Sequence, residues 1–163
     1  MLKEIDIHAA NENKVFSKTR VGCRGVVVKD CRMLVSHEVK TDYYLIPGGG
    51  LEKNETPEEC CAREVCEETG YVVKPKSHFL TINEYYKDCK FTSHYFVCDI
   101  IGESEQCLTA AEAQRGLVAE WISTKKVLEI YSKYDDFAAT NEEKRCSYLR
   151  EYTALQEYFN LFL

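Results

Sequence analysis

The chain has 163 residues, which is enough for one domain with a full hydrophobic core. Apolar residues make up 45% and charged residues 29%, as in an ordinary globular protein. The formal net charge of -6 argues against a nucleic acid polymer as partner, because proteins that bind such polymers usually carry a basic face, but it is compatible with a small phosphorylated ligand neutralised by a metal ion.

The cysteines and the start of the chain indicate a cytoplasmic protein. The nine cysteines are an odd set without regular spacing, so we expect reduced thiols, with neither a disulfide framework nor a zinc site. The first residues contain no apolar segment typical of a signal peptide, and no apolar run is long enough to span a bilayer. We therefore expect no association with membranes.

The first part of the chain predicts strands. Residues 1–19 are polar and predict an N-terminal extension or an edge strand. Residues 21–28, rich in Val and Gly, predict a buried strand, and residues 33–37 a strand that returns from a turn at 29–30. Residues 43–46 predict a short strand that leads into a proline and three glycines.

A helix is expected over residues 57–69. Thr56 suits the N-cap, Pro57 the first helical position, and Glu59 completes a capping box. Gly70 stands where a helix usually ends.

The second half predicts strands and then two helices. The strands are expected at residues 71–73, 79–86, 91–101 and 117–122. The helices are expected at residues 124–132 and 142–161. Interleaved strands and helices indicate a single α/β domain over residues 1–163.

The helix over 57–69 has two distinct faces. Glu64, Glu67 and Glu68 are related by steps of three and four and lie within one arc. Cys61 and Val65 lie on another arc and are expected to pack inward. Three carboxylates on one rigid face suit a hard divalent cation such as Mg²⁺ or Mn²⁺, although a solvated acidic face is the simpler alternative.

The spacing of this segment resembles the signature of the Nudix hydrolases, G-x5-E-x7-R-E-U-x-E-E-x-G-U, in which U is a bulky apolar residue. The matching positions are Gly49, Glu55, Arg63, Glu64, Val65, Glu67, Glu68 and Gly70. The single departure is Tyr71, aromatic where an aliphatic residue is usual. The resemblance implies a Nudix-type α/β/α sandwich with a mixed β-sheet and a catalytic helix at about 57–69.

The resemblance also assigns roles to these residues. It implies that Mg²⁺ or Mn²⁺ is bound by Glu64, Glu67, Glu68 and the carbonyl of Gly48. Gly49 and Gly50 let the backbone approach the substrate closely. Arg63 and Glu55 are expected to position the carboxylates. An ion pair between Arg63 and Glu67, one helical turn apart, is the simpler alternative for this arginine, and both can hold together.

By resemblance, the chain is an enzyme that hydrolyses a phosphoanhydride bond. The substrate is a nucleoside diphosphate linked to a group X, with oxidised or other nucleoside triphosphates among the candidates, and the products are a nucleoside monophosphate and phosphorylated X. A carboxylate must accept the proton of the attacking water. Glu112 is our candidate beside the motif glutamates, although it also completes a capping box with Thr109; Glu120 is second, and an exposed strand position is its simpler explanation.

Other features of the substrate site are less defined by the sequence. Tyr85 and Tyr86 are candidates to contact the substrate, although aromatic rings in strands more often pack in the core. The alternative to an enzyme is a Nudix module that senses a nucleotide or binds a protein without turnover, but such members usually lose motif glutamates. Many relatives are dimers, so a homodimer is expected by analogy.

Overall fold

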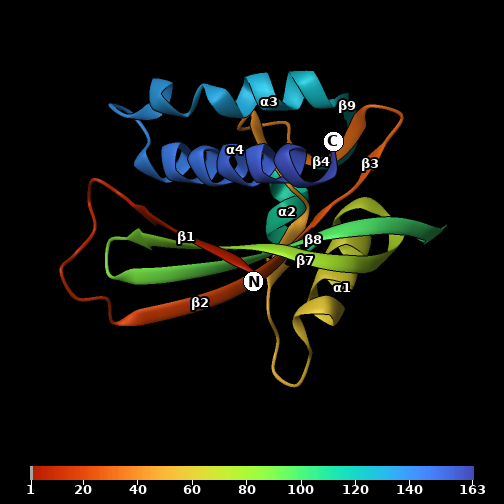
Figure 1. Ribbon diagram of the computed structural model, residues 1–163, viewed down its shortest axis with the longest axis horizontal. Helices are drawn as coiled ribbons and strands as arrows, with labels where there is room; N and C mark the ends of the chain where they lie inside the picture. Colours follow the sequence, from red (N-terminus) through yellow and green to blue (C-terminus); the bar gives the residue numbers. More distant parts are fainter. Residues whose placement is uncertain (1) are drawn as a thin grey trace.

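The structure is a computed structural model that describes residues 2–163. Its β-sheets lie between helices on opposite sides (Figure 1). Helix α1 (Pro57–Thr69) lies on one side, and α3 (Thr124–Ser132) and α4 (Glu142–Phe162) pack together on the other. The α/β fold with helices on both sides is as predicted.

The first sheet has five strands in the order β1-β7-β8-β2-β6. They are β1 (Lys3–His8), β2 (Lys18–Val26), β6 (Gly48–Gly50), β7 (Tyr71–Tyr86) and β8 (Cys89–Glu103). Strand β1 runs parallel to β7, and β2 runs parallel to β8, whereas the other two pairs are antiparallel. The sheet is therefore mixed, and the N-terminal residues supply one of its edge strands.

Strand β7 joins two segments that the sequence pattern predicts separately. Its register against β8 shifts at three places, between Val72 and Val73, around Pro75 and just before Leu80. A bulge breaks the alternation of buried and exposed side chains, and proline cannot donate a ladder hydrogen bond. For these reasons, the middle of the strand does not resemble a strand in the sequence.

The second sheet has four strands, with β4 at its centre. They are β3 (Val28–Lys29), β4 (Arg32–Glu38), β5 (Tyr43–Leu45) and β9 (Leu117–Ser123). The hairpin turn lies one residue later than predicted, because Lys29 still pairs with Arg32 and the turn is formed by Asp30 and Cys31. Their φ angles of 51° and 57° are those of a two-residue turn that matches the strand twist. All partners of β4 are antiparallel to it.

Helix α1 has the predicted ends and the predicted caps. The side chain of Thr56 accepts a hydrogen bond from the N–H of Glu59, and the Glu59 carboxylate accepts one from the N–H of Thr56 at 2.7 Å. Gly70 ends the helix with a φ of 76°, in the left-handed region that favours glycine. These local signals fix the residue at which the helix begins, and therefore the direction in which its glutamates point.

Three short elements were not predicted. Strand β6 lies within the glycine segment, and a 3-10 helix (Tyr134–Phe137) follows α3. The third element, α2 (Ala110–Arg115), has a sequence signal only in the capping box of Thr109 and Glu112. Glycine weakens a strand, so β6 depends on its pairing with β2 rather than on its own residues.

Two apolar clusters fill the space between the layers. The cluster under α1 includes the inward-facing Cys61 and Val65, both fully buried, as predicted. The cluster under α3 and α4 contains Leu80, Tyr95 and Leu155, also fully buried. Within the described residues, all nine cysteines are unpaired.

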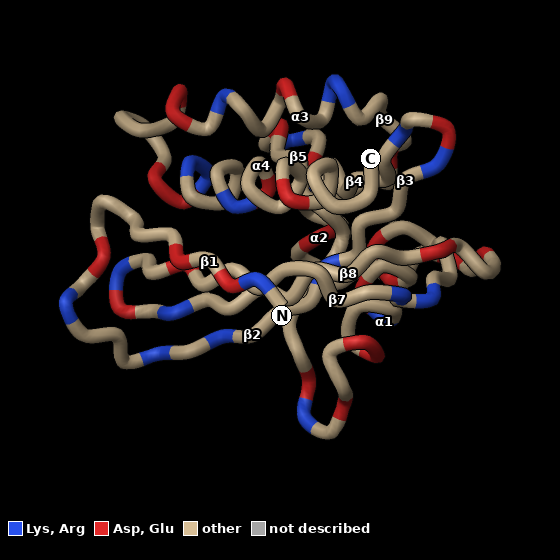
Figure 2. The backbone as a smooth tube through the Cα atoms, viewed as in Figure 1, with Lys and Arg blue, Asp and Glu red and all other residues tan. Residues whose placement is uncertain are grey.

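The surface carries mixed charge. Figure 2 shows Lys and Arg interspersed with Asp and Glu along the described chain. Within residues 2–163, no helix combines the length and the apolar character that crossing a membrane requires.

Candidate active site

The glycine strand β6 brings backbone against the acidic face of α1. Gly48, Gly49 and Gly50 pair with Arg24, Cys23 and Gly22 of β2, and this pairing fixes the strand beside the helix. The carboxylate of Glu64 lies so close to Gly49 that a Cβ there would stand 2.5 Å from its Cδ. A side chain at this position would displace Glu64, so the close approach requires glycine.

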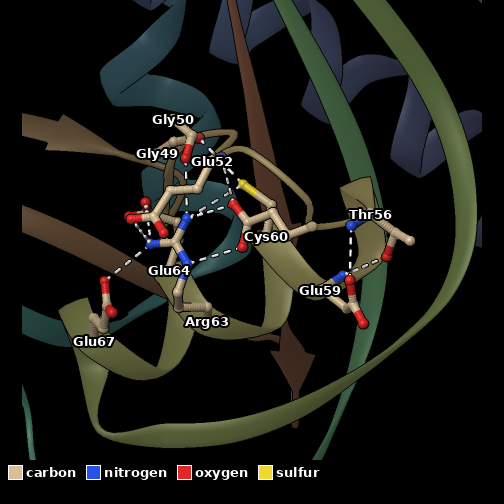
Figure 3. A network of polar contacts seen from close by, with 10 residues as sticks. Gly49, Gly50, Glu52, Thr56, Glu59, Cys60, Arg63, Glu64 and Glu67 are labelled. Atoms are coloured by element: carbon tan, nitrogen blue, oxygen red, sulfur yellow. Dashed lines mark hydrogen bonds and ion pairs between the residues drawn. The ribbon is translucent and has the colours of Figure 1, made fainter.

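One guanidinium group connects three carboxylates of the site (Figure 3). Arg63 donates to both oxygens of Glu55, at 3.0 and 2.7 Å, and to Oε1 of Glu64 at 2.7 Å. It also donates to Oε2 of Glu67 at 3.2 Å and to the carbonyl of Gly50 at 3.0 Å. The contacts of both sequence alternatives for Arg63, the positioning of carboxylates and the ion pair with Glu67, are therefore present together.

The pKa values of Glu55 and Glu64 are shifted in opposite directions. The Arg63 guanidinium lowers the pKa of Glu55 to about 2. Burial raises the pKa of Glu64, although Arg63 opposes this shift, and the negative charges of Glu67 and Glu112 add to it. Glu55 therefore stays ionised as a partner of Arg63. For Glu64, burial disfavours the ionised form, so a nearby cation would stabilise that form.

Glu68 is the most deeply buried acid of the site, with 6% of its surface exposed. Its Oε2 accepts hydrogen bonds from the hydroxyl of Ser36 at 2.5 Å and from the N–H of Gly48 at 3.3 Å. Burial raises the pKa of Glu68 to about 7, even though Ser36, Arg24 and the Gly48 N–H lower it. Its ionised form would gain from a cation at this position.

Glu112 lies on α2, near the same site. Its carboxylate accepts a hydrogen bond from the N–H of Thr109 at 2.8 Å, so the capping box expected from the sequence is formed. Its charge also raises the pKa of Glu64. The helix-cap alternative is therefore present in the structure, and the same carboxylate lies close enough to influence the acidic face.

Glu120, the second candidate for the catalytic base, lies elsewhere. It is half-buried, and its Oε1 lies 2.7 Å from Nδ1 of His37. Along β9 its neighbours Ala119 and Trp121 pack into the cluster under α1, so the side chain of Glu120 points to the other face of the sheet. Glu120 lies in a strand, as expected, but it is half-buried rather than exposed, and its side chain points away from α1.

The two candidate tyrosines, Tyr85 and Tyr86, lie in different surroundings. Tyr86 lines a cavity of about 550 Å³ between the first sheet, β5 and α4. Tyr85 instead stacks on His8 of the edge strand, with ring centroids 4.8 Å apart. Neighbouring residues of a strand point to opposite faces, so only one of the two can reach the cavity.

The cavity borders the acidic site through Arg24. This residue lines the cavity, donates to the carbonyl of Ile46 at 2.8 Å and packs against Gly48. Its charge also reaches Glu68, whose pKa it lowers. Neither Arg24 nor Ser36 was predicted from the sequence, where the only signal was a charged residue inside a Val- and Gly-rich strand.

The oxygen donors of the site fit a hard divalent cation. Among residues 2–163, no three His, Cys, Asp or Glu side chains already converge on one point as a metal cage does. Arg63 instead engages Glu64 and Glu67, and Ser36 engages Glu68. Carboxylate and carbonyl oxygens are nevertheless the ligands that Mg²⁺ and Mn²⁺ prefer, and the raised pKa of the buried Glu68 marks a place where positive charge would be stabilising.

Comparison with known proteins identifies the family. A family model described as NUDIX domain matches residues 19–142, which is more than half of the chain. The chain belongs to the Nudix family. The fold of this Nudix protein also resembles the NUDIX hydrolase from Nitrosomonas europaea, with a TM-score of 0.61 and 22% identity over 84% of this chain and 90% of that one.

Curated relatives of this Nudix protein have diverse names. It is 30% identical over 94 residues to the ADP-ribose pyrophosphatase of Methanocaldococcus jannaschii, covering 55% of the chain and 56% of the relative. It is 29% identical over 113 residues to diphosphoinositol polyphosphate phosphohydrolase 3-alpha of Mus musculus, covering 69% and 66%. The chain thus spans about half to two thirds of the length of these relatives.

Proposed function

We propose that this single-domain Nudix protein is a pyrophosphohydrolase that depends on Mg²⁺ or Mn²⁺. It hydrolyses a nucleoside diphosphate linked to a group X, giving a nucleoside monophosphate and phosphorylated X. The observation that carries this proposal is the position of Glu64, Glu67 and Glu68 on one face of α1 against a glycine strand. Arg63 connects Glu64 and Glu67 to Glu55, and the N–H of Gly48 reaches Glu68.

Each residue of the site has a task in this reaction. Glu64, Glu67, Glu68 and the carbonyl of Gly48 bind the divalent cation, which neutralises the anionic oxygens of the diphosphate when it is bound. Arg63 and Glu55 hold the carboxylate rotamers. The absence of a side chain at Gly49 leaves room for the carboxylate of Glu64 against β6.

A carboxylate near the diphosphate accepts the proton of the attacking water. Glu112 is the candidate from outside the motif, because its negative charge contributes to the raised pKa of Glu64. To act in this way, its carboxylate must leave the N–H of Thr109. A glutamate of the motif is the alternative.

The substrate extends from the acidic face into the cavity that Tyr86 lines. The volume of this cavity, about 550 Å³, is in the range typical of small-molecule sites. Arg24 lies between the cavity and Glu68, and its guanidinium suits a phosphate oxygen there.

A second candidate function is a nucleotide-binding module without turnover. The hydrogen bond from the N–H of Thr109 to Glu112 favours it, because in this arrangement Glu112 serves as a helix cap and not as a base for water. The cytoplasmic location expected from the cysteines and the homodimer expected by analogy with the family are part of this proposal.

The test is hydrolysis of a substrate panel with Mg²⁺ or Mn²⁺. The panel contains nucleoside triphosphates, oxidised nucleotides, nucleotide sugars and dinucleoside polyphosphates. Glu67→Gln and Glu68→Gln should each lose most of the turnover while circular dichroism stays unchanged. Glu157→Gln, which removes a surface ion pair with Lys3, is the matched control. Turnover that persists in both motif variants would contradict this site, and no turnover on any substrate would favour the binding module.

A further inference from the structure

A second group of charges lies beneath the cavity, away from the acidic face of α1. Arg150 of α4 donates to Oε2 of Glu84 at 2.5 Å and to Oε1 of Glu151 at 2.7 Å. Glu84, Arg150 and Glu151 expose only 5%, 6% and 0% of their surfaces. A buried ion pair of this kind costs desolvation and often contributes little net stability, so its presence in the floor of a cavity calls for another explanation.

Glu84 and Arg150 retain unused hydrogen-bonding capacity. The guanidinium of Arg150 has five N–H groups, and three nitrogen-to-oxygen contacts to Glu84 and Glu151 account for three of them. Oε1 of Glu84 accepts no hydrogen bond from the side chains of residues 2–163, whereas Oε2 is bound to Arg150. Since both residues line the cavity, a spare donor and a spare acceptor lie beside each other there.

The remaining lining of the cavity suits a flat group. Tyr43, Tyr86 and Phe91 contribute aromatic rings, and Leu45 adds an aliphatic surface. Aromatic rings of this kind provide stacking surfaces for planar ligands.

The charges of the cavity argue against a strongly anionic ligand. Its cations are Arg24, Lys87, Arg115 and Arg150, and its acids are Glu38, Glu84 and Glu143. Arg115 is already paired with Glu38 at 2.5 Å, and Arg150 with two acids. Arg24 lies 3.6 Å from Glu151, so Lys87 is the one lining cation outside an ion pair within residues 2–163. A group carrying several phosphates would need several unpaired cations.

We propose that Glu84 and Arg150 determine substrate specificity by hydrogen bonding to the edge of a nucleobase, with Arg150 donating to an acceptor of the ring and Glu84 accepting from a neighbouring N–H. The inference rests on the proposed function, because it places the nucleoside of the substrate in this cavity and its diphosphate at α1. It also makes polyphosphorylated inositols poor ligands, in contrast to the name of the mouse relative.

The test measures binding of reaction products, so it does not depend on turnover. Isothermal titration calorimetry with Mg²⁺ compares the five common nucleoside monophosphates with ribose 5-phosphate, which lacks the nucleobase, and with inositol hexakisphosphate. At least one monophosphate should bind about tenfold or more tightly than ribose 5-phosphate, because hydrogen bonds to charged groups are stronger than those between neutral groups. Inositol hexakisphosphate should bind more weakly than that monophosphate.

Glu84→Gln tests the pair directly. An amide that keeps its oxygen on Arg150 presents an NH₂ group to the ligand, where the carboxylate presents an acceptor. The preference for the nucleobase should fall about tenfold or more, while the Kd of ribose 5-phosphate stays unchanged. Glu142→Gln is the matched control, because Glu142 also pairs with an arginine of α4, Arg145 at 2.6 Å, but does not line the cavity.

Clear results would overturn the inference. These are equal affinity for the monophosphates and ribose 5-phosphate, or an unchanged nucleobase preference in folded Glu84→Gln. If that variant does not fold, a crystal structure of the wild-type protein with the tightest monophosphate decides the question. A nucleobase more than about 4 Å from Oε1 of Glu84 would then contradict the proposal, whereas absent turnover with nucleobase-selective binding would refute only the proposed reaction.

Discussion

The guanidinium of Arg63 binds the carboxylate of Glu55 side-on, with Nε donating to Oε2 at 3.0 Å and Nη2 donating to Oε1 at 2.7 Å. This paired geometry requires the planar fork of arginine, which lysine cannot reproduce. It leaves Nη1 free to contact Glu64 and Glu67. Arg63 is therefore oriented by one acid while it positions two others.

Arg63→Lys should reduce kcat/KM by about 10–100-fold. It should also weaken Mg²⁺ binding, so that more Mg²⁺ is needed for half-maximal activity. The positive charge remains, but the side-on contact with Glu55 is lost, so the carboxylate rotamers are no longer fixed. Steady-state kinetics over a range of Mg²⁺ concentrations would measure both effects. The control is Arg145→Lys, which alters the pair of Arg145 with Glu142 on α4, away from the site. An equal loss of kcat/KM in both variants would contradict a specific role for Arg63.

Gly49→Ala should lower turnover about tenfold or more, since the new Cβ would stand 2.5 Å from Cδ of Glu64 and push its carboxylate away. The φ angle of Gly49 is not positive, so the substitution strains the contact and not the backbone. The control is Gly102→Ala in β8, whose Cβ would lie 3.7 Å from Val72, an ordinary contact. Comparing turnover with the melting temperature of both variants separates the two effects, and normal turnover in Gly49→Ala would show that Glu64 is free to move.

The raised pKa of Glu68, at about 7 against an ordinary 4.5, predicts a specific pH dependence. Between these values the folded protein holds a proton that the unfolded chain has released, so this group lowers stability as pH rises. Without metal, Glu68→Gln should therefore gain stability relative to wild type more at pH 8 than at pH 5. Urea unfolding at both values would measure this difference, and a difference independent of pH would refute the raised pKa.

The same group predicts that Mg²⁺ binding weakens as pH falls below about 7. A cation must displace the proton of Glu68, so the two compete for one carboxylate. Calorimetry of Mg²⁺ binding across this range would measure the effect. Ser36→Ala removes a hydrogen bond that lowers the pKa of Glu68, so it should move the weakening to higher pH.

Tyr131→Phe should stabilise the protein by about 1 kcal/mol. The hydroxyl of Tyr131 is buried, and within residues 2–163 no group accepts a hydrogen bond from it or donates one to it. Tyr148→Phe is the matched comparison and should destabilise, because its hydroxyl accepts from the N–H of Tyr44 at 3.1 Å. Urea unfolding of both variants measures the contrast, and a loss of stability in Tyr131→Phe would indicate a partner for its hydroxyl.

The sequence by itself determined the acidic helix and the family. The caps at Thr56 and Gly70 and the helical spacing of the glutamates are local, so they are visible without knowing any distant contact. Because one turn of helix fixes which side chains share a face, the motif spacing also predicted that Arg63 contacts Glu67.

Only the tertiary structure decided what lies around that helix. Ser36 reaches Glu68 across 32 positions of the chain, and Arg150 reaches Glu84 across 66. Such contacts depend on which strands pair and in which register, and a shift of one residue turns a side chain to the opposite face. This is why Tyr86 faces the cavity and Tyr85 does not, and why the glycine segment became a strand only through its pairing with β2.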